Sequence, residues 1–335
     1  MSGAEGVSRA GGMLRLAVIG GGENSEHDVS LASAAGVASA AIECGFTVVG
    51  LTIGRDGTWA TAAGAPIGVE DAVRILRSCD VAFPALHGVN GEDGLLAAFL
   101  TAIGVPYVGS DMPAGVLGMD KWVTKLIAEA VGVATAPGVL VRAGTRPSSA
   151  LPAVPVVVKP VAAGSSHGVT FVADAALIDL AVVAALEHDD RVLVEKAVVG
   201  REVDIAVIER ADGALTVSPP LEIDLGGEDV FGTERKYGGT ARFAVPAPVS
   251  DSVRVEMESA ARTLFRALGC RGVARFDFFV TDSGIVLNEV NTMPGFTAQS
   301  QVPQMFEAAG WSYARLVGEL VEVALAGAVV RPVRG

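Results

Sequence analysis

The stretch from Arg275 to Gly295 most narrows what this chain can fold into, because it has the pattern of a β-hairpin that carries oxygen ligands. Two runs rich in β-branched and aromatic residues flank Asp282-Ser283-Gly284, and a three-residue loop that ends in glycine is a common hairpin closure. With that loop, residue 277 lies opposite residue 289, and side chains repeat on one face at every second residue. One face is therefore expected to carry Asp277, Glu289, Asn291 and Arg275.

Two carboxylates and an amide on one face suit Mg²⁺, which prefers oxygen ligands and completes its shell with water and substrate phosphates. The alternative is a solvated hairpin face, since exposed carboxylates are common. The neighbouring Arg275, the amide of Asn291 and the exit through Pro294-Gly295 favour the metal site. The hairpin thus predicts a nucleotide site that does not use a P-loop.

Length and charge limit the class of protein. A chain of 335 residues allows about two or three domains, and half of its residues are hydrophobic, which is enough for a large core. The net charge of -13, without a long basic run, argues against nucleic-acid partners and anionic membrane surfaces. The odd, widely spaced Cys44, Cys79 and Cys270 predict reduced core residues of a cytoplasmic protein without a zinc site. Residues 1–13 lack the apolar stretch of a signal peptide and are expected to be a disordered tail.

The distribution of apolar runs predicts an α/β class that changes to α+β along the chain. Strand-like runs at residues 14–19, 47–53 and 80–84 alternate with helical segments, which predicts a small parallel α/β domain. Ser25 and Asp28 are spaced as a capping box for a helix that continues to about Glu43. From Val156 the chain turns to long strands, and the glycine-dotted segment 224–240 is expected to be a mobile lid.

A loop of small residues follows the apolar strand that ends at Lys159. Backbone N–H groups of Gly164-Ser165-Ser166 can surround phosphate oxygens, and the lysine adds a compact point charge. An ordinary β-turn is the competing interpretation, because glycine and serine dominate turns. Near the next strands, Glu195-Lys196 and Glu202 either bind adenine and ribose or form salt bridges.

His87 begins a segment that follows a strand and opens a helix, so its ring and the nearby N–H groups could meet a carboxylate or a phosphate. The alternative is a hydrogen-bonded structural histidine. Gly20-Gly21-Gly22, after the first strand, superficially resembles a dinucleotide-binding fingerprint. It lacks the required glycine spacing, and no acidic residue ends the second strand, so we reject that function.

Eight motifs carry a family resemblance when they are taken in order. They are Gly21-Gly22-x-x-Ser25-Glu26-x-x-Val29-Ser30, Leu86-His87-Gly88 with Gly91-Glu92-Asp93-Gly94, Tyr107-Val108-Gly109, Met119-Asp120-Lys121 with Lys125, Val158-Lys159-Pro160 with Gly164-Ser165-Ser166, Lys236-Tyr237, Ala274-Arg275-x-Asp277, and Asn288-Glu289-x-Asn291-Thr292-x-Pro294-Gly295. Together they resemble D-alanine-D-alanine ligases of the ATP-grasp superfamily, from about Leu14 to the C-terminus.

The resemblance implies an ATP-grasp fold with three domains and a cytoplasmic homodimer. The expected parts are an N-terminal α/β substrate domain at 14–118, a central subdomain at 119–200, and a C-terminal domain at 201–335 that holds the lid and the metal hairpin. By similarity, the ATP phosphates meet Lys121, Lys159, Ser166 and Lys236, and adenine and ribose meet Glu195, Lys196, Val198 and Glu202. Two Mg²⁺ ions, or Mn²⁺ in their place, are implied at Asp277, Glu289 and Asn291.

The resemblance also implies a mechanism with two steps and D-amino acids as substrates. The first D-alanine becomes an acyl phosphate, and the amine of the second attacks its carbonyl. By similarity, Glu26 binds the first ammonium near His87, Arg275 and the N–H of Gly295 stabilise the oxyanion, and Ser300 with Gln301 contacts the second substrate. A hydrogen-bonded closure over the site is implied for Ser165, Tyr237 and Glu26.

Three departures from the family pattern bear on the acceptor and on ATP binding. Gln301 stands where most relatives carry Leu or Met, the segment 231–237 lacks the usual extra tyrosines, and Val161-Ala162-Ala163 replaces a more polar start of the phosphate loop. Relatives that make D-alanyl-D-lactate lack the tyrosine that corresponds to Tyr237. We therefore expect D-alanine as the principal acceptor, good use of D-serine, and poor use of D-lactate.

Two other functions remain as alternatives. One is a sibling ligase that joins D-alanine, or another small amino acid, to a different acceptor in resistance or secondary metabolism. The other is a nucleotide-binding protein without catalysis, which is disfavoured because every chemical position holds a competent residue.

Overall fold

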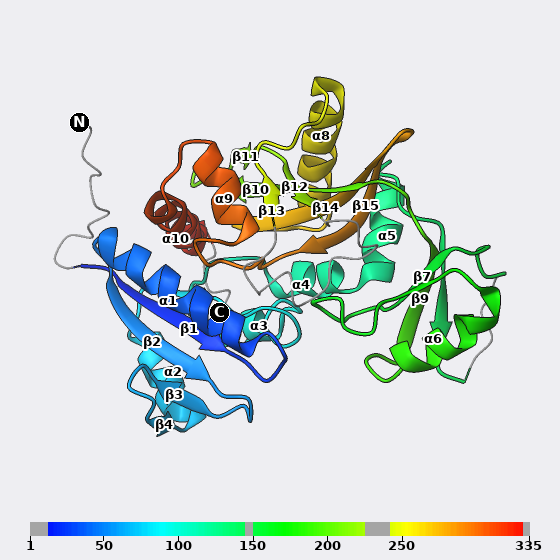
Figure 1. Cartoon of the computed structure of the whole chain (residues 1–335). Coiled ribbons are helices and arrows are strands. Elements are labelled where there is room, and N and C mark those ends of the chain that lie inside the picture. Colours follow the sequence, from blue (N-terminus) through cyan, green and yellow to red (C-terminus); the bar gives the residue numbers. More distant parts are fainter. Residues whose placement is uncertain (1–12, 145–149, 225–241, 331–335) are drawn as a thin grey trace.

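Three β-sheets surround the centre of the molecule in the computed structural model (Figure 1), which describes residues 13–144, 150–224 and 242–330. The expected tail up to residue 12 and the expected lid from residue 225 onward, with Lys236 and Tyr237, lie outside the described residues. Within the described ranges, no helix has the length and apolar character needed to cross a membrane.

The first sheet has the strand order β4-β3-β2-β1-β5. Its strands are β1 (Arg15–Gly21), β2 (Thr47–Ile53), β3 (Trp59–Thr61), β4 (Pro66–Ile67) and β5 (Val81–Pro84). β1 pairs in parallel with β2 and β5, but β2, β3 and β4 pair antiparallel. The expectation of a parallel sheet was therefore wrong for its outer edge. Only residues 54–58 separate β2 from β3, too few for the crossover that parallel strands need.

Helices cover both faces of this sheet. α1 (His27–Glu43) and the C-terminal α10 (Tyr313–Val330) pack on one face, and α2 (Val69–Arg77) with α3 (Leu95–Ala102) packs on the other. The expected capping box at the start of α1 was wrong. The helix begins at His27, its N-cap residue is Glu26, one position after the predicted cap Ser25, and no side chain caps it.

The second sheet is antiparallel throughout, with the order β6-β9-β7-β8. It contains β6 (Gly138–Arg142), β7 (Val156–Pro160), β8 (Thr170–Val172) and β9 (Arg191–Lys196). The 3-10 turn η1 (Ala175–Leu177) leads into α6 (Ile178–Ala185), which packs on β7. Before the sheet, α4 (Met112–Met119) and α5 (Lys121–Ala130) cross the middle of the molecule (Figure 1).

The third sheet has the order β13-β12-β10-β14-β15, with β11 paired to β10. Its strands are β10 (Arg201–Glu209), β11 (Leu215–Val217), β12 (Leu221–Asp224), β13 (Arg242–Ala244), β14 (Val273–Thr281) and β15 (Gly284–Asn291). Alternate residues such as Val203, Ile205 and Phe276 pack on α8 (Asp251–Ala267). The opposite face packs its Ala206 and Ile208 against α9 (Gln301–Ala308) and α10.

The hairpin of β14 and β15 has the predicted partners but reaches them by another route. Thr281 pairs with Gly284, so the loop has two residues, not three. A bulge between Asp277 and Phe278 then inserts one extra residue, Asn288, on β15 and shifts the register. Asp277 consequently pairs with Glu289, as predicted, and Arg275 pairs with Asn291.

Candidate active site

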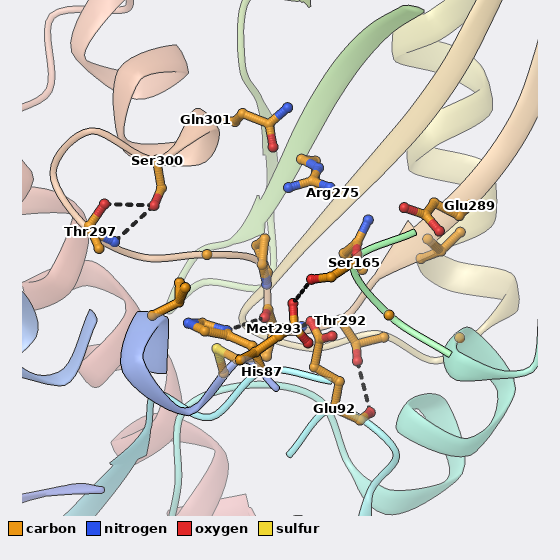
Figure 2. A pocket seen from close by; sticks show the side chains of 18 of the residues that line it. His87, Glu92, Ser165, Arg275, Glu289, Thr292, Met293, Thr297, Ser300 and Gln301 are labelled. Atoms are coloured by element: carbon orange, nitrogen blue, oxygen red, sulfur yellow. Dashed lines mark hydrogen bonds between the residues drawn. The ribbon is translucent and has the colours of Figure 1, made fainter. Parts of the chain in front are cut away.

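A cavity of about 730 Å³ lies where the three sheets meet. Its walls come from the start of α1, the segment after β5, the small-residue loop after β7, the hairpin, and the turn before α9 (Figure 2). Among the residues predicted from the sequence, it brings together Glu26, His87, Lys121, Ser165, Arg275, Glu289, Asn291, Gly295, Ser300 and Gln301.

Glu26 and Ser165 join two distant segments of the chain across this cavity. The Ser165 hydroxyl donates a hydrogen bond of 2.5 Å to Glu26 Oε1, and both residues are buried. The other carboxylate oxygen lies over Gly88, where a Cβ atom would come within 2.2 Å of it, at a backbone φ of +67°. Position 88 therefore needs glycine both for its backbone conformation and for the space that the Glu26 carboxylate occupies.

The small-residue loop holds a strained backbone beside this hydrogen bond. Ser165 and Ser166 both have positive φ, at 51° and 59°, a conformation that costs free energy for residues other than glycine and is found at ligand-binding sites. Lys121 Nζ donates to the carbonyl oxygen of Ala163 at 2.9 Å and lies 3.4 Å from Glu289 Oε2. One lysine at the start of α5 thus connects the loop to the hairpin.

His87 is a buried histidine with a defined hydrogen-bond pattern. Its Nδ1 lies 3.0 Å from the carbonyl oxygen of Met293, so it donates there, and its Nε2 lies 2.9 Å from the hydroxyl of Ser33. Burial lowers the pKa of His87 below its ordinary value, even though the Glu26 carboxylate acts in the opposite direction. A neutral ring is consistent with these contacts, and it fixes the segment after β5 against the turn that begins at Met293.

Glu92 lines the cavity and was not selected from the sequence. Its two carboxylate oxygens accept hydrogen bonds from the N–H groups of Gly88 and Met293, at 3.0 and 3.1 Å. Burial, reinforced by the nearby Glu26 carboxylate, raises the pKa of Glu92 to about 8. The signal was present in the Gly91-Glu92-Asp93-Gly94 motif, but only the fold shows that the side chain points inward (Figure 2).

Three acidic residues form a row across neighbouring strands of the third sheet. Asp204 of β10 pairs with Asp277 of β14, which in turn pairs with Glu289 of β15. Arg275 donates to both oxygens of Asp277, each at 2.7 Å, and its Nε lies 3.7 Å from Asp204 Oδ2. Burial acts to lower the pKa of Arg275, but the three carboxylates outweigh it and raise that pKa well above its ordinary value.

The acidic row supplies oxygen donors at the residues predicted to hold a divalent cation, although the described part of the chain contains no group of three or more His, Cys, Asp or Glu side chains arranged to hold a metal ion. The three carboxylates face two cations, Arg275 and Lys121, so one negative charge is in excess, and oxygen donors of this kind are the ligands that Mg²⁺ prefers. Asn291 donates through its amide nitrogen to Asp277 at 3.0 Å, which leaves its oxygen as a donor atom for a metal. Asp277 accepts three hydrogen bonds, fewer than its oxygens can take.

The turn before α9 provides donors for an anion. The hydroxyl of Ser300, the N-cap residue of α9, accepts a hydrogen bond from the N–H of Thr297 at 3.0 Å and lies 2.8 Å from the Thr297 hydroxyl. The first N–H groups of a helix have no partners within it and attract negative charge. Gly295 precedes Thr297 in the same turn and lines the cavity. This end of the cavity suits a carboxylate.

Lys125, Glu195 and Lys159 form a buried triad outside the cavity lining. Lys125 Nζ lies 2.6 Å from Glu195 Oε2, Lys159 Nζ lies 2.5 Å from Glu195 Oε1, and all three side chains are at most 7% exposed. Burial acts to raise the pKa of Glu195, but the two lysines outweigh it and lower that pKa. Burial also lowers the pKa of Lys125. The triad holds two positive charges against one negative charge, which suits a site for phosphate.

The other residues expected to contact ATP do not line the cavity. Glu202 is buried, Val198 is partly exposed, and Lys196 is exposed, with its N–H bound to the carbonyl oxygen of Pro137. Lys159 and Glu195 point toward each other in the triad. The roles assigned to these residues, and to Ser166, stay predictions.

Comparison with known proteins gives concordant results. Residues 143–322 match the family described as D-ala D-ala ligase C-terminus, and residues 65–110 match D-ala D-ala ligase N-terminus. The D-alanine--D-alanine ligases of Nocardia farcinica and Rhodococcus opacus are 38% and 39% identical, and each alignment covers 93% of this chain and 97% of the relative.

Solved structures of similar fold include two ligases. The VanG D-Ala:D-Ser ligase from Enterococcus faecalis superimposes with a TM-score of 0.81 at 30% identity, over 93% of this chain and 100% of that chain. The D-alanine-D-alanine ligase from Coxiella burnetii superimposes with a TM-score of 0.79 at 26% identity, over 95% of both chains.

Proposed function

Because the chain belongs to the D-alanine-D-alanine ligase family, we propose that it joins two D-alanines with ATP, releasing ADP and phosphate, for peptidoglycan synthesis. The fold is the ATP-grasp fold. The observation that carries the proposal is the single cavity that unites the Glu26–Ser165 pair, Arg275 and the start of α9. Glu26 suits the ammonium of the first amino acid, Arg275 suits the oxyanion that forms during peptide bond formation, and the start of α9 suits the carboxylate of the second amino acid.

The first step activates the first D-alanine. We place its ammonium at Glu26, and its carboxylate oxygen attacks the γ-phosphorus of ATP, so that a new P–O bond forms as the bond to the ADP oxygen breaks. Phosphoryl transfer of this kind needs positioning and charge neutralisation and no protein nucleophile. Lys121 and the triad around Lys159 supply positive charge beside the small-residue loop.

The second step forms the peptide bond. The amine of the second D-alanine attacks the acyl carbon, loses a proton, and phosphate leaves. Arg275 and the N–H of Gly295 receive the developing oxyanion. The two hydrogen bonds from Arg275 to Asp277 hold its guanidinium in place before the reaction, and preorganised donors of this kind stabilise a transition state more than mobile ones.

We propose two Mg²⁺ ions, or Mn²⁺, as the metals at Asp277, Glu289 and Asn291. When bound there, such a cation neutralises phosphate charge and orients the reacting oxygen atoms. Support comes from the excess of negative charge in the row that includes Asp277 and Glu289.

D-Alanine is proposed as the principal acceptor, and D-serine is the second candidate. The specific observation in favour of D-serine is Gln301, a polar side chain in the cavity wall beside Ser300. The structural similarity to a D-Ala:D-Ser ligase agrees with it. The expectation that D-lactate is used poorly depends on Tyr237, which lies outside the described residues.

A homodimer in the cytoplasm remains part of the proposal. The adjoining helices α3 and α4 expose the apolar side chains of Leu95, Met112 and Val116, a surface that a second copy could cover. Sedimentation analysis at several protein concentrations tests the dimer, and a sedimentation coefficient of a monomer at every concentration would contradict it.

The central experiment measures ADP release and product formation together. Purified protein with ATP, Mg²⁺ and D-alanine should release ADP and form D-alanyl-D-alanine in equal amounts, detected by mass spectrometry. Omission of D-alanine should abolish both. If ADP is released but no dipeptide forms from D-alanine or from any pair of amino acids, the protein is not a ligase. If a dipeptide forms only with an acceptor other than D-alanine, the result supports the sibling enzyme.

A further inference from the structure

Asp204 is a fully buried acid that contacts two residues of the active site. It lies on β10, opposite Asp277, and its side chain has no exposed surface. Its Oδ2 accepts a hydrogen bond of 2.6 Å from Gln301 Nε2 and lies 3.7 Å from Arg275 Nε. A single carboxylate oxygen is thus shared between the residue proposed for the oxyanion and the residue proposed for the acceptor.

The contact fixes which end of the Gln301 amide faces the substrate. A carboxylate has no proton to donate, so the amide nitrogen and not the amide oxygen must turn toward Asp204. Gln301 lines the cavity, and the oxygen end of its amide lies on the side of Arg275 in Figure 2. The amide oxygen is therefore a hydrogen-bond acceptor on the Arg275 side of Gln301, in the cavity that Ser300 also lines.

An acceptor atom at this place distinguishes between side chains of the second amino acid. A methyl group gains nothing from an amide oxygen, whereas a hydroxyl can donate a hydrogen bond to it. Leu or Met at position 301 would present only apolar surface and discriminate weakly. The choice of glutamine matters only if its amide is held in one orientation, and Asp204 is the group that holds it.

We infer that Asp204 is a positioning residue that orients Gln301 so that its amide oxygen binds a hydroxyl on the acceptor side chain, as in D-serine. This inference rests on the proposed ligase function and adds the recognition device at its second subsite. One neutral hydrogen bond corresponds to about 2- to 12-fold in selectivity. The kcat/KM ratio of D-serine to D-alanine as acceptors is the quantity that it changes.

The test is a double-mutant cycle on that ratio, with D-alanine as the donor. Gln301→Leu should lower the ratio about 2- to 12-fold. Asp204→Leu, which has a similar shape but no acceptor atom, should lower it as well in the presence of Gln301, but should leave it unchanged in the Gln301→Leu background. A lower kcat for both acceptors in Asp204→Leu, through Arg275, does not affect the ratio. Equal effects of Asp204→Leu in both backgrounds would overturn the positioning role.

Gln301→Glu examines the same contact without altering the buried position. This variant keeps the side-chain length and the oxygen Oε1 but has a second oxygen in place of the amide nitrogen, so it can no longer donate to Asp204 and is repelled by it. The ratio should fall as in Gln301→Leu. If Gln301→Glu keeps the wild-type ratio, the contact with Asp204 is unnecessary and the inference is wrong.

Gln304→Leu is the matched control, since Gln304 lies on the same helix and lines the same cavity but donates to the carbonyl oxygen of Gln299. The kcat/KM ratio of D-serine to D-alanine in this variant should equal that of the wild type. A fall as large as in Gln301→Leu would mean that any polar side chain in the cavity wall favours D-serine, which would overturn the specific role of Gln301. If the wild type forms D-alanyl-D-alanine but Gln301→Leu does not change the kcat/KM ratio of D-serine to D-alanine, only this inference is overturned. Absence of any dipeptide overturns the proposed function and the inference with it.

Discussion

Replacing Glu195 by glutamine measures what the buried triad contributes to the fold. The wild-type carboxylate has one lysine at 2.6 Å and another at 2.5 Å, and none of the three side chains is more than 7% exposed. Glutamine keeps the volume but removes the negative charge, and its amide nitrogen then faces an ammonium group. Two buried positive charges are left without compensation, a situation that costs about 3–5 kcal/mol when one partner of a buried ion pair is removed.

The assay is urea unfolding of wild type and variants in the absence of ATP, followed by circular dichroism. Glu222→Gln is the matched control, because Glu222 binds Arg201 through two hydrogen bonds, at 2.6 and 2.7 Å, but the arginine is 44% exposed. Its loss should cost less than about 1 kcal/mol. Replacing Lys125 by methionine in the Glu195→Gln background should recover part of the loss, since it removes one of the two uncompensated charges.

The pH dependence of the free energy of unfolding is an independent test of whether the charged Glu195 carboxylate stabilises the fold. The pKa of Glu195 is lowered in the folded protein, so its stabilisation is present above the unfolded pKa and is lost as pH falls through the folded value. The difference in stability between wild type and Glu195→Gln should therefore shrink in acid. If Glu195→Gln were as stable as the Glu222→Gln control at neutral pH, the stabilising role of the triad would be refuted. A raised KM for ATP in that variant would then support the predicted nucleotide contact at Glu195.

Three further outcomes follow from the active site. Glu289→Gln should lower turnover by orders of magnitude, because the metal site loses a full ligand charge. Its circular dichroism spectrum should stay unchanged. Near-wild-type Mg²⁺-dependent turnover would exclude Glu289 as a ligand. Arg275→Ala should lower kcat by about 10²-fold or more through loss of an oxyanion donor, and a change in KM alone would make Arg275 a ground-state contact. The folded pKa of Glu92, about 8, lies above its ordinary value, so the folded state holds the proton more tightly. Stability in urea should fall as pH rises from about 4.5 to about 8, less steeply in Glu92→Gln, and identical slopes would contradict this assignment.

Sequence alone predicted the parts of this protein whose geometry is local. The spacing of the hairpin placed Asp277 opposite Glu289 and on one face with Asn291, because strand periodicity and loop closure depend on neighbouring residues. The bulge at Asn288 shows the limit of that argument. The predicted loop was one residue too long, and an irregularity that no local pattern revealed restored the pairing.

Contacts between distant segments were decided by the tertiary structure. Asp204 is one polar residue in an apolar strand and was not selected from the sequence, and its proposed role depends on Gln301, 97 positions later in the chain. For Glu195 the sequence left both a nucleotide contact and a salt bridge open, and only the fold shows that lysines from α5 and β7 lie against it. Sequence determines which charges are available, whereas burial determines their partners, because a charge removed from water must find an opposite charge or hydrogen bonds wherever the fold brings them.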